Sequence, residues 1–353
     1  MANYIEKENI FIKIAKYLFP WKGDSITEII RKVIFLAAAV VLVVSLVSLL
    51  MSGVDKVEDD KNNSEIADIY HGVTSGNTQV QIDTSKQEQI KEENPEILEE
   101  FVPLLEINED IVGWFNIGGE DDTQIDHVVV QGEDNDFYLD HNYKKEESIS
   151  GALFTDFRDP ITADSQPANI IIYGHNMASG DYFAKLLRYH NYKPYNNYGL
   201  EYYKDYPTIT FSTLYEKSTY KIFAGMIVNT RSKHGQVFDY LNNRNFESKA
   251  EFDEYIANIL DRSTFLNPDI NLKYGDELLT LSTCSFDYDY NRNLGFRWVV
   301  FARKVREGED PTVDVSKVYD NPDPLYFEYY YNTYGGSWGG RKWPAEMIQG
   351  YSY

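Results

Sequence analysis

The chain has 353 residues, room for one large domain or two ordinary ones, and 43% of them are hydrophobic, which is enough apolar material for a buried core. The formal net charge is −23, the wrong sign for a protein that holds nucleic acid by its phosphates, and this composition excludes disorder throughout. The single cysteine excludes an internal disulfide framework and any cysteine-rich zinc site.

The first element in chain order is a long apolar run at residues 33–54. Its 22 residues (VIFLAAAVVLVVSLVSLLMSGV) carry no charge, and a helix needs about 20 apolar residues to cross a bilayer core of roughly 30 Å. A cleavable signal peptide has a shorter apolar region close to the N-terminus, whereas this run begins only after 32 residues. The run therefore predicts an uncleaved, single-pass transmembrane helix.

The charges on either side of this run predict its orientation. Six basic residues precede it, and four acidic residues follow it closely: Asp55, Glu58, Asp59 and Asp60. Basic flanks remain in the cytoplasm. We therefore expect a cytoplasmic N-terminus at residues 1–32 and an extracellular location for the acidic remainder of the chain.

Residues 55–94 are polar, acidic and poor in large apolar side chains, which is typical of a flexible stalk or linker. Helical spacing of apolar residues returns at residues 95–105 (PEILEEFVPLL). We therefore expect the folded domain to open with a short helix.

Short runs rich in β-branched and aromatic residues then alternate with turn residues as far as about residue 305. Strands are expected at residues 111–117, 125–130, 152–156, 169–173, 208–213, 218–229, 277–282 and 297–303. Helices are expected at residues 182–190 and 248–260, where Ser248 and Glu251 match a capping box. Eight strands with few helices favour an antiparallel barrel or sandwich into which a helix is inserted.

The last segment, residues 307–353, is crowded with Tyr and Trp among Gly, Asn and Pro, without clear helical or strand periodicity. One interpretation is that this tail folds back over the barrel or stays partly disordered. The other is an aromatic surface for carbohydrate or a partner protein, because Tyr and Trp bury much area at low entropic cost.

Cys284 ends an apolar run (ELLTLSTC) and is followed at once by a polar loop. A lone cysteine is most often a small buried hydrophobe, but a thiol at a strand end is placed to meet a substrate. A nucleophile also needs a group that moves protons, and His175 is the best candidate because it directly follows the apolar strand at 169–173 and a glycine. For oxyanion stabilisation, Arg297 opens the strand after the cysteine loop, and Arg292 within the loop is the alternative.

Together these residues resemble the sortases, membrane-anchored cysteine transpeptidases of Gram-positive bacteria. The TLxTC…R pattern of that family is similar to TLSTC, ending at Cys284, followed by Arg297, and the family's strand-end histidine is similar to His175 in YGHNM. The segments NEDIVGWF, VQ, DNDFYL and GALFTD extend the resemblance over roughly residues 95–305. The expected helix at 248–260 is similar to the insertion of class B sortases between strands six and seven. The Cys284-to-Arg297 gap of 13 residues is longer than that class suggests.

The resemblance implies a mainly β fold, a closed eight-stranded sortase-type β-barrel with inserted helices after an N-terminal transmembrane helix. The domain boundaries expected are 1–32 for the cytoplasmic N-terminus, 33–54 for the membrane helix, 55–94 for the stalk, 95–306 for the catalytic domain and 307–353 for the tail. The tail lies outside the family's common pattern.

The resemblance also implies the chemistry. Cys284 would form a thioacyl intermediate with a C-terminal sorting motif of an exported protein, His175 would move protons, and Arg297 would hold the substrate and its oxyanion. Ser282 and Thr283 would line the peptide groove, although both can equally be ordinary strand residues. No cofactor and no metal are implied. The partners implied are exported proteins with a sorting motif, an amine of a peptidoglycan precursor or pilin, and the membrane, but no nucleic acid.

Three alternatives remain open at this point. A pilus-assembling sortase would join pilin subunits rather than anchor surface proteins to the cell wall. A secreted cysteine protease would hydrolyse the same kind of intermediate. A non-enzymatic wall-binding protein would use the aromatic tail, with the barrel as a scaffold.

Overall fold

The computed structural model describes residues 10–74, 84–119, 122–190, 199–289 and 294–351, and chain contacts divide the molecule into two units, Met1–Asp60 and Lys61–Tyr353. The helices are α1 (Ile10–Leu18), α2 (Ile26–Thr74), α3 (Thr84–Glu93), α4 (Val102–Ile107), α5 (Gly199–Asp205), α6 (Lys249–Arg262) and α7 (Glu328–Tyr334). The strands are β1 (Ile111–Ile117), β2 (Ile125–Val130), β3 (Leu153–Thr155), β4 (Asn169–Tyr173), β5 (Thr208–Thr213), β6 (Lys217–Asn229), β7 (Phe265–Leu266), β8 (Leu278–Ser285), β9 (Phe296–Lys304) and β10 (Tyr319–Asp320).

The first unit contains the apolar part of α2. Over the described residues, one helix, Ile26–Val73, is long and apolar enough to cross a membrane, and no part of its apolar stretch is buried inside the protein. Apolar side chains such as Val33, Val40 and Leu46 are exposed along it. Such exposure is costly in water and favourable in a hydrocarbon layer, so this helix has the properties predicted for residues 33–54.

The segment expected to be a flexible stalk is largely helical in the second unit, where α2 continues to Thr74 and α3 follows. Ile66 and Tyr70 of α2 are buried in a cluster that includes Phe101 and Trp114. The Tyr70 ring stacks on the Trp114 ring with 4.3 Å between centroids. Since residues four apart lie on one helix face, these two apolar side chains help to dock a helix whose composition is otherwise polar, together with the Asn62 carbonyl oxygen, which accepts from Tyr143 Oη at 2.8 Å.

The strands of the second unit close into a barrel. Neighbours follow the order β6, β5, β1, β2, β3, β4, β8 and β9, and a pairing between β6 and β9 closes the ring. This confirms the eight-stranded barrel, to which the short strands β7 and β10 are added at β6. The expectation of purely antiparallel pairing is wrong for two pairs, β2–β3 and β4–β8, which are parallel. Parallel neighbours require long connections, and the β4–β8 connection contains β5, β6 and α6.

Alternation along β8 and β9 sorts the two faces of the barrel wall. Leu279, Leu281 and Val300 belong to the cluster inside the barrel. Leu278 and Val299 belong to the cluster under α6 on the outer side. The face of any side chain near the end of β8 can therefore be read from its position in this alternation.

The expected helix at residues 248–260 is α6, inserted after β6. Its N-cap, Ser248, accepts a hydrogen bond at Oγ from the Glu251 backbone amide at 3.2 Å. The Glu251 carboxylate accepts a hydrogen bond from the Glu247 amide at 2.8 Å. In a standard capping box it would accept from the Ser248 amide, so this second bond is shifted by one residue.

The helix expected at 182–190 is instead a 3₁₀ helix, Phe183–Tyr189. The expected opening helix is a 3₁₀ turn, Glu99–Phe101, that continues into α4.

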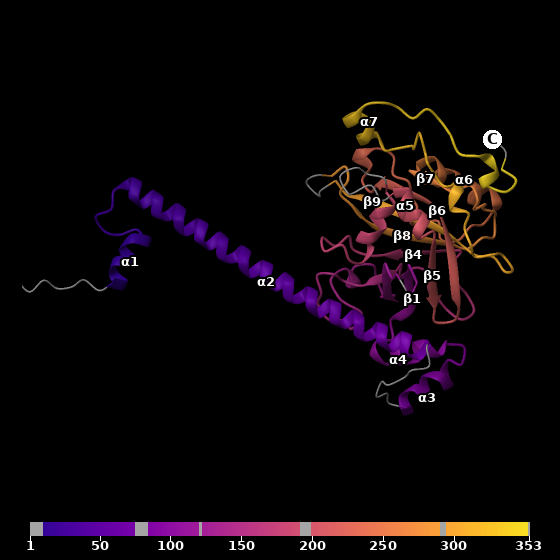
Figure 1. Ribbon diagram of the computed structural model, residues 1–353, viewed down its shortest axis with the longest axis horizontal. Helices are drawn as coiled ribbons and strands as arrows, with labels where there is room; N and C mark the ends of the chain where they lie inside the picture. Colours follow the sequence, from indigo (N-terminus) through magenta and orange to yellow (C-terminus); the bar gives the residue numbers. More distant parts are fainter. Residues whose placement is uncertain (1–9, 75–83, 120–121, 191–198, 290–293, 352–353) are drawn as a thin grey trace, which may run out of the picture. The chain divides into compact units, whose positions relative to one another are not determined.

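The described part of the tail folds back over the barrel, as the simpler interpretation holds (Figure 1). Trp343, Met347 and Ile348 are buried in the cluster under α6. The Asp261 carboxylate at the end of α6 accepts hydrogen bonds from Arg341 Nε at 3.0 Å and from Trp343 Nε1 at 2.7 Å. One buried carboxylate therefore fixes two tail side chains.

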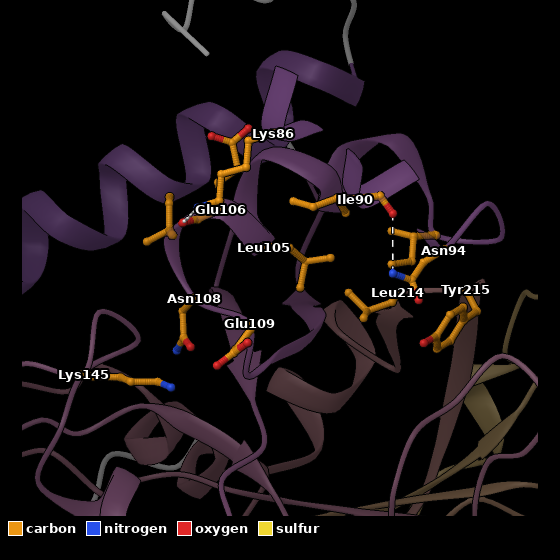
Figure 2. Close-up of a pocket in the computed structure, with 12 residues that line it drawn as sticks. Lys86, Ile90, Asn94, Leu105, Glu106, Asn108, Glu109, Lys145, Leu214 and Tyr215 are labelled. Atoms are coloured by element: carbon orange, nitrogen blue, oxygen red, sulfur yellow. Dashed lines mark hydrogen bonds between the residues drawn. The ribbon is translucent and has the colours of Figure 1, made fainter. Parts of the chain in front are cut away.

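A cavity of about 560 Å³ lies between α3, α4 and the β5–β6 turn. In Figure 2, Leu105 and Leu214 lie in the middle of its lining, with Lys145 at one side and Tyr215 at the other. The β5–β6 turn is at the start of β6, whereas the end of β6 pairs with the start of β9 beside Cys284. The cavity is therefore at the opposite end of the barrel from the cysteine, and we assign it no part in the site.

A buried carboxylate holds the end of β4. Asp156 accepts hydrogen bonds from Arg158 Nε at 2.7 Å, Arg158 Nη2 at 2.6 Å and Tyr173 Oη at 2.8 Å. Burial raises the pKa of Asp156, but the Arg158 and Tyr173 hydrogen bonds outweigh it and lower the pKa to about 2. Tyr173 is two residues before His175, so this network positions the chain that carries the histidine.

We predict that Asp156→Asn lowers the free energy of unfolding by about 2 kcal/mol at pH 7, because the carboxylate is more stable in the folded than in the unfolded chain. A depressed pKa gives stability that is present above the unfolded value near 4 and is lost as the pH falls through about 2. The cost of the substitution should therefore shrink over that acidic range. Denaturant unfolding of the full-length chain in detergent measures it. Asp164→Asn, at an exposed position, is the control, and a cost independent of pH would contradict this.

We further predict that Asp261→Asn lowers the free energy of unfolding by about 2–3 kcal/mol, since it weakens charge-assisted bonds to Arg341 and Trp343. Limited proteolysis should then cut the tail faster. Glu346→Gln, an exposed tail carboxylate, should change stability by less than about 0.5 kcal/mol. Equal proteolysis rates in the two variants would refute the anchoring role.

Candidate active site

Cys284 lies near the end of β8, the strand that pairs with β4 on one side and β9 on the other. It shares the outer face with Leu278, Thr280 and Ser282, since side chains alternate along a strand. Unlike its buried neighbours, Cys284 is partly exposed. The thiol is therefore at the margin of the barrel wall, with solvent access, rather than in the core.

His175 lies beside Cys284 on the parallel strand. In the β4–β8 register Tyr173 is paired with Ser282, so continuing it by two residues sets His175 against Cys284. The Gly174 amide donates to the Ser282 carbonyl oxygen at 3.3 Å, and Asn176 Nδ2 donates to the Cys284 carbonyl oxygen at 2.9 Å. These two bonds, one on each side of His175, hold the histidine segment along the end of β8.

The histidine ring and the glycine before it have defined roles in this arrangement. His175 Nε2 lies 2.7 Å from the Leu139 carbonyl oxygen. Because a carbonyl oxygen only accepts, Nε2 carries a proton, and Nδ1 is left for proton exchange. Gly174 is required by packing rather than by a turn, since a Cβ there would lie 2.4 Å from Leu153 Cδ2 and 2.8 Å from Phe183.

Arg297 lies directly opposite Cys284 in the antiparallel β8–β9 register. Directly opposed residues project on the same face with Cβ atoms about 5 Å apart. The Arg297 side chain is half-buried, and its Nη1 donates to the Phe296 carbonyl oxygen at 3.1 Å. Arg292, the alternative, is outside the described residues.

Ser282 and Thr283, which were expected to line the peptide groove, both have buried side chains. Ser282 shares the Cys284 face but is buried, with its Oγ 2.8 Å from Tyr240 Oη. Thr283 alternates to the inner face and is 2% exposed. The structure therefore brings Ser282 beneath the site and turns the Thr283 side chain away from it.

Tyr240, Asn176 and the Leu139 carbonyl are parts of the site that the sequence analysis did not select. Tyr240 is buried; burial raises the pKa of its hydroxyl, and the hydrogen bond with Ser282 opposes this in part. Tyr240 lies in the segment before α6, and no local sequence pattern there predicts that its hydroxyl belongs to the site. Asn176 directly follows His175, so adjacency was the one available clue.

The described residues hold no group of three or more His, Cys, Asp or Glu side chains arranged to bind a metal ion. The groups gathered at the end of β8 are a thiol, an imidazole and a guanidinium. A thiolate is a nucleophile, an imidazole exchanges protons near neutral pH, and a guanidinium donates planar hydrogen bonds to a carbonyl oxygen. This combination fits acyl transfer through a thioester.

Comparison with solved structures finds the same fold in sortase B proteins. Sortase B from Bacillus anthracis in complex with AAEK1 aligns with a TM-score of 0.53 and 27% identity, covering 72% of this chain and 99% of that one. A C232S mutant of Clostridium perfringens sortase B aligns with a TM-score of 0.51 and 26% identity, covering 70% and 98%.

Comparison of sequences gives the same family. Sortase B of Listeria monocytogenes is 32% identical over 199 residues, which cover 56% of this chain and 72% of that protein. Sortase B of Staphylococcus aureus is 27% identical over 189 residues, covering 54% and 69%. A scan against protein-family models finds no match. With a relative more than 30% identical over most of its length and the same closed barrel, this chain belongs to the sortase B family.

Proposed function

We propose that this chain is a membrane-anchored cysteine transpeptidase that cleaves a C-terminal sorting motif of exported proteins and transfers the acyl group to an amine of the cell wall. The observation that carries the proposal is the register of three adjacent strands, which sets Cys284 beside His175 and opposite Arg297. Membership of the sortase B family supports the same reaction class.

In the first half-reaction, the Cys284 thiolate attacks the carbonyl carbon of the scissile peptide bond. A C–S bond forms, and the C–N bond breaks when the leaving amine takes a proton from His175. Arg297 donates hydrogen bonds to the oxygen on which negative charge develops. The product of this step is a thioacyl enzyme and the released C-terminal tail of the substrate.

In the second half-reaction, an amine attacks the thioester carbon. A new C–N bond forms, the C–S bond breaks, and the proton lost by the amine passes to His175 while Cys284 returns as thiolate. Amine attack must outrun attack by water, which distinguishes a transpeptidase from a protease. The membrane helix would keep the catalytic unit near membrane-attached substrates, with the barrel outside the cell, which raises their effective concentration.

We predict that Cys284→Ala forms no product, and that Arg297→Lys lowers kcat about a hundredfold because a point charge cannot reproduce the planar pair of donors. Full-length chain in detergent is incubated with a library of sorting-type peptides and an amine acceptor, and the products are weighed by mass spectrometry. Arg306→Lys is the control, because Arg306 pairs with Asp276 beyond the other end of β9.

Three outcomes would contradict parts of this proposal. Hydrolysed peptide without amide product, at saturating amine, would make the chain a protease. Full activity of Arg297→Ala together with an inactive Arg292→Ala would move the arginine role into the loop. Cys284→Ala with undiminished product would exclude the thioacyl route altogether.

A further inference from the structure

The C-terminal tail forms one wall of a pocket that begins one strand away from Arg297. Val228 of β6 lies opposite Arg297 in the β6–β9 register, so both project on the outer face. Val228 also lines a cavity of about 230 Å³. Its other walls include Phe238 before α6, Arg262 at the end of α6, and Phe327 and Tyr331 of the tail.

Arg262 is a cation without a carboxylate partner in the described part of the chain. Its Nη1 donates to the Asn258 carbonyl oxygen at 3.0 Å and to Asn258 Oδ1 at 2.9 Å, and its guanidinium lies 4.8 Å from the Phe238 ring centroid. The adjacent Asp261 carboxylate is already taken by Arg341 and Trp343. Burial lowers the pKa of Arg262, and the nearby Asp261 carboxylate opposes this in part.

A guanidinium has five N–H donors, and the bonds to Asn258 use only one nitrogen. A charge that is partly removed from water and forms no ion pair with the described carboxylates favours an incoming anion. Glu328 also lines the cavity, but it is exposed, so water screens it. The electrostatic preference of the pocket is therefore for a small carboxylate held bidentately by Arg262.

We propose that this pocket binds the carboxylate of the acyl acceptor while the acceptor's amine reaches the thioester on Cys284; this rests on the proposed function. Cys284, Arg297 and Val228 lie on three successive strands, and two strand spacings are about 10 Å. An extended tripeptide spans about 10 Å, which is enough to reach from Cys284 to the wall of the pocket at Val228. The sorting motif is attacked at an internal peptide bond, so its backbone brings no free carboxylate to this place.

The first test measures binding without chemistry. Triglycine and triglycinamide, which differ in the carboxylate, are titrated calorimetrically into full-length Cys284→Ala in detergent. Triglycine should bind about tenfold more tightly, and Arg262→Gln in the same background should remove the difference. Arg262→Lys should retain part of it, and Arg306→Gln, at the opposite end of the barrel, should retain all of it. Equal affinity of the two peptides for Cys284→Ala would overturn the proposal.

The second test measures transfer and separates this proposal from the proposed function. With a cleavable peptide as donor, the ratio of kcat/KM for triglycine over triglycinamide should be about ten and should fall to about one in Arg262→Gln. If triglycine binds through Arg262 but no thioacyl enzyme forms, the pocket stands and the transpeptidase proposal fails. If Arg262→Gln raises KM for the donor and leaves the acceptor ratio unchanged, the pocket serves the donor and this proposal is wrong.

A separate observation concerns the loop between Cys284 and Arg297. Tyr288 in that loop contacts four tail rings, with centroid distances of 6.1 Å to Tyr326, 6.2 Å to Phe327, 5.2 Å to Tyr330 and 5.6 Å to Tyr334. Phe296, next to Arg297, stacks on Phe327 at 4.5 Å. Rings packed at these distances contribute beyond their buried area.

We infer that this tail cluster is a positioning device for the described residues on either side of that loop, 285–289 and 294–297, with Tyr288 as its central residue. Tyr288→Ala should speed hydrogen exchange of the backbone amides at residues 285–289 and 294–297, and Tyr288→Phe, which keeps the ring, should not. On the proposed function, Tyr288→Ala should also lower kcat about tenfold with KM little changed. Tyr274→Ala, which removes an exposed ring elsewhere, is the control. Unchanged exchange in Tyr288→Ala would refute the device, whatever the activity.

Discussion

The pairing of β8 with β4 on one side and β9 on the other is the constraint on which the site depends. Parallel and antiparallel ladders fix which residues are neighbours, and a slip of one residue would turn every side chain to the other face. In this register Cys284 is opposite Arg297 and beside the segment of His175. Inner-face residues such as Leu281 and Val300 are fully buried in the barrel, so a slip of one residue would remove them from the barrel interior and turn the Cys284 side chain inward. The core therefore enforces the geometry of the site.

The tail adds a second layer to this arrangement. Asp261 links α6 to Arg341 and Trp343, and the aromatic rings of the tail pack against Tyr288 and Phe296 on either side of the cysteine loop's described parts. The tail, whose composition is irregular, is thereby joined to α6 and to β9, the strand that carries Arg297. Several of its tyrosines pack ring against ring, as Tyr326 does on Tyr330 with 4.0 Å between centroids.

Much of the fold was predictable from the sequence because strand signals are local. The predicted strands at residues 111–117, 125–130, 169–173 and 208–213 coincide with β1, β2, β4 and β5. The two-residue strands β7 and β10 were missed because they are too short to show alternation. The parallel pairs were missed because pairing partners are set by topology rather than by local pattern. The helical part of the expected stalk was missed because docking rests on few apolar side chains, among them Ile66 and Tyr70.

The site was predictable in part for the same reason. Cys284, His175 and Arg297 each stand at a strand end, which is visible in the sequence. Tyr240 is brought to Ser282 by the path of a loop, although the two residues are 42 positions apart in the chain. The environment of Arg262 is set by Phe238 and by the tail residues that line the same pocket. The face of Thr283 is decided by alternation within β8, which places its side chain inside the barrel.

The thioacyl intermediate on Cys284 is tested most directly by measuring the mass of the protein during turnover. Full-length chain in detergent is mixed with a cleavable sorting-type peptide without amine acceptor, quenched in acid and weighed intact. We expect an added mass equal to the N-terminal part of the peptide, located by digestion on the fragment that contains Cys284 and lost when an amine is supplied. Peptide cleavage without any adduct, or an adduct located on another residue, would contradict the claim that the strand register of Cys284, His175 and Arg297 forms a thioacyl-transfer site.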